Sequence, residues 1–152
     1  MKLAEALILR ADLQTKFEQL KQRLLLNAKV QEGDKPAEDP AKLLKELEDV
    51  SAELVRLIQR INATNSTTPL VDGLTVADAI ARRDVLRMKQ AAYRELAATA
   101  AVKQDRYTKS EVKFASTVDI ARLQKQADAL AKEHRELDTK IQEANWLTDL
   151  KE

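Results

Sequence analysis

LLKELEDVSAELVRLIQRI, at residues 43–61, is the most regular segment of the chain. Its apolar residues recur in alternating steps of four and three, which is the period of a helix that packs against another helix in a coiled coil. Leu44 and Ile58 widen this apolar face, so we expect the helix to contact more than one neighbour. The residues that set the period are Leu43, Leu47, Val50, Leu54, Leu57 and Ile61.

The composition of the whole chain favours the same kind of structure. Glycine and proline make up only 5 of 152 residues, from 2 glycines and 3 prolines, so the chain can form few tight turns. A chain of this length fits one domain, because a single core serves roughly 100 to 200 residues. We therefore predict one helical domain over residues 1–152, of mainly α class, in which four long antiparallel helices meet along coiled-coil-like seams. Either an up-down-up-down bundle or two long hairpins would satisfy this pattern.

Caps and breakers give the expected bounds of the first two helices. The first is predicted over residues 2–30, because Gly33 follows it and can end a helix. The second is predicted over residues 40–62. It starts well at Asp39-Pro40, because Asp is a good capping residue and Pro suits the first helical position.

The third and fourth helices have similar start signals. Thr75 and Asp78 have the spacing of a capping box, so a third helix is predicted over residues 76–102. Ser116 and Asp119 have the same spacing before the fourth helix, whose apolar residues recur at steps of three and four.

Two short segments predict a small β element between these helices. Asp72-Gly73 is a pair favoured in tight hairpin turns, which suggests extended residues near 67–74. Residues 107–118 break the helical period and alternate apolar with polar residues toward their end. We expect a strand near 111–118 that could pair with the extended residues near Leu70.

Unusual polar residues concentrate where three helix ends should meet if the helices alternate in direction. Arg83 is the expected centre of this group, because a guanidinium can hold a carboxylate in bidentate fashion and still donate to amide oxygens. It occupies a position that the seven-residue period assigns to the core. The candidate ligand-binding cluster comprises Asn62, Asn65, Arg82, Arg83, Asp84, Asp138, Gln142, Asn145 and Trp146.

This cluster has two interpretations. It is structural if Arg83 and its polar partners set the register between helices, as buried polar residues do in coiled coils, and if Asn62 and Asn65 cap the second helix. It is a small-molecule or anion pocket if Arg82 or Arg83 anchors a charged ligand beside Trp146. No catalytic residue is assigned, because an Asp, an Arg and two amides include no nucleophile and no obvious base. A non-catalytic protein is favoured, and an undiscovered enzyme that uses this cluster stays open as an alternative.

His134 is the only histidine, and it lies on the apolar stripe of the fourth helix. We expect a packed or interface residue, or a pH-sensitive element if it faces a second subunit. No metal or cofactor is expected, because the chain has one histidine, no cysteine and no glycine-rich phosphate loop. A lone divalent ion bound by carboxylates stays open.

Charge and hydropathy limit the expected partners. The chain has 26 basic and 25 acidic residues, a net charge of +1, so it lacks the basic excess typical of nucleic-acid binders, despite a local basic cluster at residues 82–89. It has no apolar stretch near the roughly 20 residues that a membrane span needs. We expect a cytoplasmic homo-oligomer that does not bind membranes, with any small-molecule ligand unknown.

Several short motifs occur together in this chain: INATN at 61–65, ARRD at 81–84, QAD at 126–128, HRELD at 134–138, IQE at 141–143 and NW at 145–146. In combination they resemble the septicolysin-like family of small bacterial proteins. The resemblance covers nearly the whole chain and implies a mostly helical bacterial protein without an established activity. The family name suggests membrane lysis, but the mixed-sign charges beside the seams favour packing between proteins instead.

Overall fold

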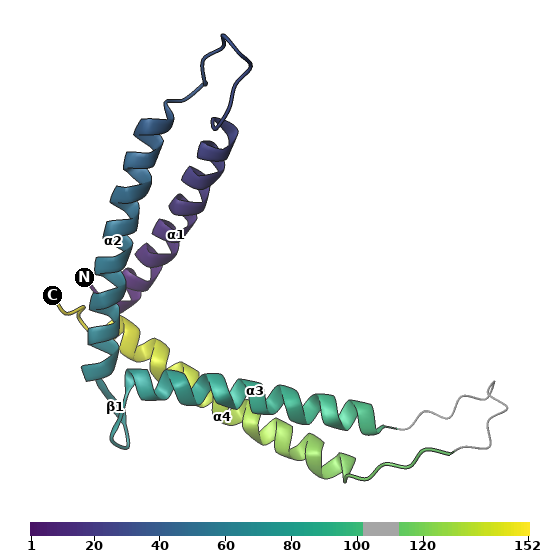
Figure 1. The fold of residues 1–152 in the computed structure, drawn as a ribbon. Coiled ribbons are helices and arrows are strands. Elements are labelled where there is room, and N and C mark those ends of the chain that lie inside the picture. The colour runs from purple at the N-terminus through teal and green to yellow at the C-terminus, as the bar shows by residue number, and fades with distance from the viewer. Residues whose placement is uncertain (102–112) are drawn as a thin grey trace. The chain divides into compact units, whose positions relative to one another are not determined.

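The computed structural model describes residues 1–101 and 113–152, which form four helices and a β-hairpin of two short strands (Figure 1). The predicted mainly α class is confirmed. The helices pack in pairs, α1 with α2 and α3 with α4. The elements are α1 (Leu3–Leu26), α2 (Pro40–Thr67), β1 (Pro69–Val71), β2 (Leu74–Thr75), α3 (Val76–Ala100) and α4 (Ile120–Leu147).

The described chain divides into two compact units. The first unit contains residues 1–69 and 143–152, and the second contains residues 70–142. The α1–α2 hairpin therefore lies in the first unit and the β-hairpin and α3 in the second, while α4 contributes residues to both. The single domain predicted from the length stays a prediction.

The first unit is built on a seam with a seven-residue repeat. Ala6, Leu13 and Leu20 of α1 are buried at intervals of seven, and so are Leu43, Val50 and Leu57 of α2. This spacing keeps one face of each helix against the other, and burying a leucine side chain contributes roughly 2 kcal/mol before its loss of entropy. The periodicity of residues 43–61 therefore predicted the seam of α2 correctly.

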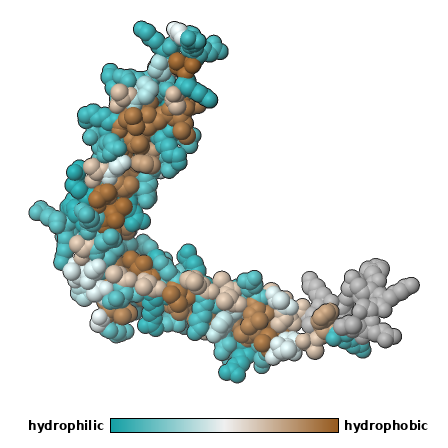
Figure 2. All heavy atoms as spheres, in the orientation of Figure 1, coloured by the Kyte–Doolittle hydropathy of each residue, from teal (hydrophilic) through white to brown (hydrophobic). Residues whose placement is uncertain are grey.

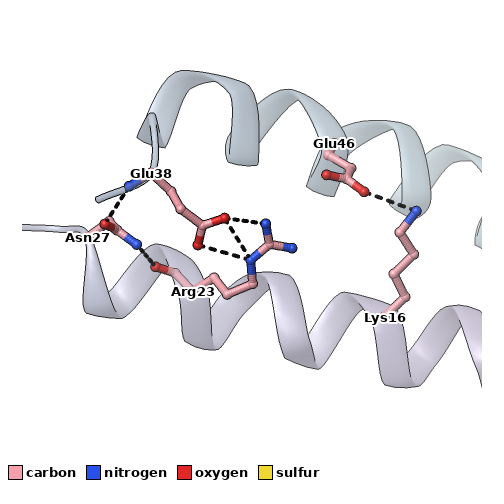
Figure 3. Close-up of polar contacts among 5 residues, drawn as sticks. All are labelled: Lys16, Arg23, Asn27, Glu38 and Glu46. Atoms are coloured by element: carbon pink, nitrogen blue, oxygen red, sulfur yellow. Dashed lines mark hydrogen bonds and ion pairs between the residues drawn. The ribbon is translucent and has the colours of Figure 1, made fainter. Parts of the chain in front are cut away.

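The end of α1 differs from the prediction because Asn27 stops the helix four residues before position 30. Its side-chain Nδ2 donates to the carbonyl of Arg23 at 2.8 Å, and its Oδ1 accepts from the backbone N–H of Glu38 at 3.0 Å. One side chain thus caps α1 and fixes the chain that leads into α2 (Figure 3).

Helix α2 starts as predicted but ends later. Asp39 accepts a hydrogen bond from the N–H of Ala41 at 3.0 Å, and Pro40 is the first helical residue. The helix continues beyond Asn62 to Thr67, and threonine hydroxyls inside its last turns bond to carbonyls four residues back. Thr64, which is fully buried, donates to the carbonyl of Arg60 at 2.8 Å. The predicted end of α2 at residue 62 is therefore wrong.

The two ends of the chain pair within the first unit. The N–H of Leu3 donates to the carbonyl of Thr148 at 2.9 Å, and the N–H of Leu150 donates to the carbonyl of Met1 at 2.9 Å. The N–H of Lys151 donates to the buried hydroxyl of Thr64 at 3.0 Å. This C-terminal segment is consequently tied to both α1 and α2.

One of the two predicted β segments is confirmed. Asp72 and Gly73 have positive φ angles of 47° and 77° and form the tight turn between β1 and β2, a conformation that suits Gly and Asp. Residues 113–118 contain no strand, so the element predicted near 111–118 is wrong for that part. Its alternating residues lack a neighbouring strand, because β1 already pairs locally with β2. The rest of that prediction, residues 111–112, lies outside the described residues.

The starts of α3 and α4 are both capped by side chains. At α3 the predicted capping box is present, because Thr75 accepts from the N–H of Asp78 at 3.2 Å and Asp78 accepts from the N–H of Thr75 at 2.9 Å. At α4 the cap is Asp119, which accepts from the N–H of Arg122 at 3.0 Å. Ser116 instead bonds to Val118, so the predicted pairing of Ser116 with Asp119 is wrong.

The core of the second unit is smaller than that of the first. It consists of Ala79 and Leu86 from α3 with Leu137 and Ile141 from α4. Leu96 of α3 is 44% exposed, whereas its neighbour Ala97 is 3% exposed and takes the inward position. The second unit therefore has fewer large apolar side chains to hold its two helices together.

Candidate functional site

The nine residues of the predicted polar cluster fall in both units. Among them, the structure brings Arg83, Asp84 and Asp138 into direct contact. Asn145 is buried, whereas Trp146 is 57% exposed. The first unit holds Asn62, Asn65, Asn145 and Trp146, and the second holds Arg82, Arg83, Asp84, Asp138 and Gln142.

Arg83 is the centre of the contacts that are present. Its Nη1 donates to Oδ1 of Asp138 across the α3–α4 pair at 2.9 Å, while its Nε and Nη2 both donate to Oδ1 of Asp84 at 3.0 Å. The Arg83 side chain is 22% exposed, and that of Asp138 is 37% exposed. Arg83 therefore holds two carboxylates, and both belong to its own chain.

The electrostatics of Arg83 keep it charged. Its partial burial lowers the pKa of the guanidinium, but the hydrogen bonds to Asp84 and Asp138 raise it, and the resulting pKa lies above the ordinary value. Two carboxylates facing one guanidinium leave the group with an excess of negative charge. An added anion would have to compete with both aspartates.

Two further ion pairs join α3 to α4 on either side of Arg83. Arg82 donates to Glu133 at 2.9 Å, and Arg94 donates to Asp128 at 3.4 Å. Because Arg82 and Arg83 are both paired with acids, they are less free to contact nucleic-acid phosphates. Glu133 and Asp128 were missed from the sequence, since only the register between the two helices shows which acids face which arginines.

The first unit has the same distribution of charge between its paired helices. Lys16 of α1 pairs with Glu46 of α2 at 3.0 Å, and Arg23 of α1 pairs with Glu38, which precedes α2 (Figure 3). The guanidinium of Arg23 lowers the pKa of the Glu38 carboxyl. In both units the cations lie on the first helix of the pair and the acids on or just before the second, which favours antiparallel pairing of unlike helices over pairing of like ones.

Two polar atoms among the described residues are buried without a hydrogen-bond partner: Oδ1 of Asn65 and Nε2 of His134. His134 is partly buried on the face of α4 that carries Leu137, in agreement with its predicted place on the apolar stripe. Asn62 and Asn65 lie inside α2 and do not cap it, because the C-cap residue of that helix is Thr68. The capping role proposed for Asn62 and Asn65 is therefore wrong.

A concave surface of the second unit lies away from Arg83. It is a hollow of about 420 Å³ bounded by the C-terminal end of α3 and by residues 114–118, and the described side chains that line it are uncharged. Within residues 1–101 and 113–152, no group of three His, Asp or Glu side chains is placed to hold a metal ion. No helix in that same part of the chain is long and apolar enough to cross a bilayer.

Comparisons with known proteins agree with this description of the fold. The structure is similar to the crystal structure of a functionally unknown conserved protein from Corynebacterium diphtheriae, with a TM-score of 0.93 and 47% sequence identity over 99% of each chain. No curated protein matches the chain. The model of a family of unknown function, DUF6847, matches residues 10–150. The chain therefore belongs to the DUF6847 family.

Proposed function

We propose that this protein is a self-associating structural or interaction protein rather than a catalyst. The observation that carries this proposal is the set of large apolar side chains that remain exposed along the outer faces of the paired helices. Figure 2 shows hydrophobic residues reaching the surface in both units between hydrophilic ones. Apolar surface that lies in lines rather than singly is typical of protein interaction sites.

These side chains line up along the helices. On α2, Leu44 and Val55 are 50% and 54% exposed and lie three turns apart, on one side of the helix. On α3, Val85 and Met88 are 60% and 70% exposed and also share one side. A two-helix hairpin covers only one face of each helix, so the other faces are available to a partner.

The polar cluster supports a structural role over ligand binding. The nitrogens Nε, Nη1 and Nη2 of Arg83 each donate to an aspartate of the same chain. An Arg–carboxylate contact between facing helices restricts their register, because a shift by one turn would separate the charges. The alternative of an anion or small-molecule module built on this cluster would require displacement of Asp84 or Asp138.

The mass of the protein in solution tests the proposal. Sedimentation equilibrium from about 1 µM to 500 µM should give a mass that rises above the 17.1 kDa of one chain. A monomer mass over the whole range would overturn self-association. The septicolysin-like resemblance and the cytoplasmic location stay predictions, and the membrane-lysing role that the family name suggests stays a remote alternative. Release of a dye from phosphatidylglycerol vesicles would test the last of these.

A further inference from the structure

The outer face of α3 carries one continuous apolar stripe that no described helix or strand covers. At its C-terminal end, Leu96 also lines the hollow bounded by residues 114–118. The members of the stripe recur in steps of four, three, four and four, which follow a nearly straight α-helix. Val85, Met88 and Leu96 are 60%, 70% and 44% exposed. The stripe lies about a third of a turn from the buried seam of α3. The outer stripe of α3 consists of Ala81, Val85, Met88, Ala92 and Leu96.

Opposite charges flank the two edges of this outer stripe. At 100° per residue, Asp84 and Glu95 fall on one edge, while Arg82 and Lys89 fall on the other. Between residues 81 and 96 each edge thus has one sign of charge, and Lys89 is the main basic group of its edge because Arg82 already pairs with Glu133 of α4. Because the two edges differ in charge, a second helix packed on the stripe meets different charges in the parallel and in the antiparallel orientation.

We propose that the outer stripe of α3 binds the same stripe of a second copy of this chain, with the two α3 helices parallel and in register. The proposal rests on the self-association proposed above and names its surface and geometry. When two copies of a helix face each other and run in the same direction, the acidic edge of one meets the basic edge of the other. In the antiparallel orientation each edge meets itself, so acid would face acid.

The parallel orientation places a specific ion pair on each side of the stripe. Asp84 and Lys89 are five residues apart on opposite edges, which is the separation that joins flanking charges in parallel coiled coils. Both hydrogen bonds that Arg83 makes to Asp84 end on Oδ1, and Oδ2 accepts none among the described residues. Lys89 is exposed, and its Nζ lies 5.7 Å from the centre of the Tyr93 ring. Asp84 could therefore accept from the partner's Lys89 while it keeps Arg83.

The size of the stripe predicts a weak and reversible contact. Three large apolar side chains and two alanines cover less surface than the roughly 800 Å² per partner of a stable complex. The two alanines allow the helix backbones to approach closely, as small residues do at helix interfaces. We accordingly expect association to depend on protein concentration and to weaken as salt screens the flanking charges.

Disulfide trapping tests the geometry directly, because the chain has no cysteine of its own. Ala81→Cys and Ala92→Cys introduce one thiol each at exposed positions on the stripe. Val55→Cys is the comparison, because Val55 lies on the exposed apolar face of α2, the competing surface for self-association. A disulfide needs Cα atoms within about 7 Å, whereas positions 81 and 92 are separated by about 16 Å along the helix. Parallel pairing in register can therefore join 81 to 81 and 92 to 92, but not 81 to 92.

The expected result under mild oxidation is a covalent dimer from each stripe variant alone, and at least five-fold less from Val55→Cys. In a mixture of the two stripe variants, disulfides that form only between position 81 of one copy and position 92 of the other would overturn the parallel orientation. If the native chain associates by mass but only Val55→Cys cross-links, self-association stands and this surface is wrong. A chain that stays monomeric by mass removes both proposals together.

Charge exchange provides an independent check of the ion pair. Lys89→Asp should weaken association at least five-fold, because it places acid opposite Asp84 of the second copy. Combining Lys89→Asp with Asp84→Lys should restore association, with helical content followed by circular dichroism in both variants. Restoration by the double exchange supports the pairing, whereas equal association in the wild type and Lys89→Asp overturns it.

Discussion

Nη1 of Arg83 donates to Oδ1 of Asp138 at 2.9 Å across the α3–α4 pair, although the two residues are 55 positions apart in the chain. The same guanidinium is held by Asp84 on its own helix, so it links a local contact to a long-range one. A link of this kind specifies the register of α3 against α4. Its contribution to stability is the most direct test of the structural interpretation.

Replacing Arg83 with alanine should lower the free energy of unfolding by about 1–2 kcal/mol, because it leaves the partly buried Asp138 without its donor. Arg94→Ala is the matched control on the same helix. Its pair with Asp128 is longer, at 3.4 Å, with side chains 57% and 77% exposed, so its loss should cost less than about 0.5 kcal/mol. Urea unfolding followed by circular dichroism measures both, and equal effects of the two substitutions would contradict the special role of Arg83.

The capping box at the start of α3 should make stability depend on pH at the acidic end. Hydrogen bonds from the backbone and side chain of Thr75 lower the pKa of Asp78 below its ordinary value of 3.8. A lowered pKa in the folded state means that the stabilisation is present above about pH 4 and is lost as the pH falls through the folded value. The difference in unfolding free energy between the wild type and Asp78→Asn should therefore be larger at pH 7 than at pH 2.5. A difference that is unchanged between these two pH values would disprove this contribution.

His134 should be dispensable for stability and even unfavourable. Its Nε2 is buried without a partner among the described residues, and such an atom loses its bond to water without gaining another. His134→Leu should raise the free energy of unfolding by about 1 kcal/mol, since it removes that unsatisfied atom and keeps the apolar contacts. His134→Ala is the comparison, because it removes the same atom but also leaves a cavity and should not stabilise. Destabilisation by the leucine variant would show that Nε2 has a partner in the assembled protein.

The buried leucines of the two seams can test the predicted single domain. Leu20 of the first unit is 1% exposed and Leu137 of the second is 8% exposed, so truncation of either to alanine should cost about 2–5 kcal/mol. If residues 1–152 unfold as one domain, both variants should shift the same single thermal transition. Two transitions, of which each variant shifts only one, would show that the units unfold separately.

Much of the helical structure could be predicted from local sequence. The seven-residue spacing of residues 43–61, the Asp39-Pro40 start, the Thr75–Asp78 box and the Asp72-Gly73 turn depend on residues only a few positions apart, and the structure confirms each of them. The failures have a common cause. Residue 62 is not the end of α2, and residues 113–118 contain no strand, because the outcome there depends on what packs or pairs with the segment.

In the candidate site, too, local sequence predicted some features and packing between helices decided the others. The residue types of Arg83 and Asp138 made an ion pair chemically reasonable, but no spacing along the chain indicates which acids of α4 face which arginines of α3. That match depends on the register of two helices connected by about twenty residues, and a shift of one turn, about 5.4 Å, would bring different side chains together. The sequence by itself therefore determined that this protein forms long helices with apolar seams. Only the tertiary structure decided which polar groups meet, because helix formation is local whereas the contact between helices requires closing a long loop.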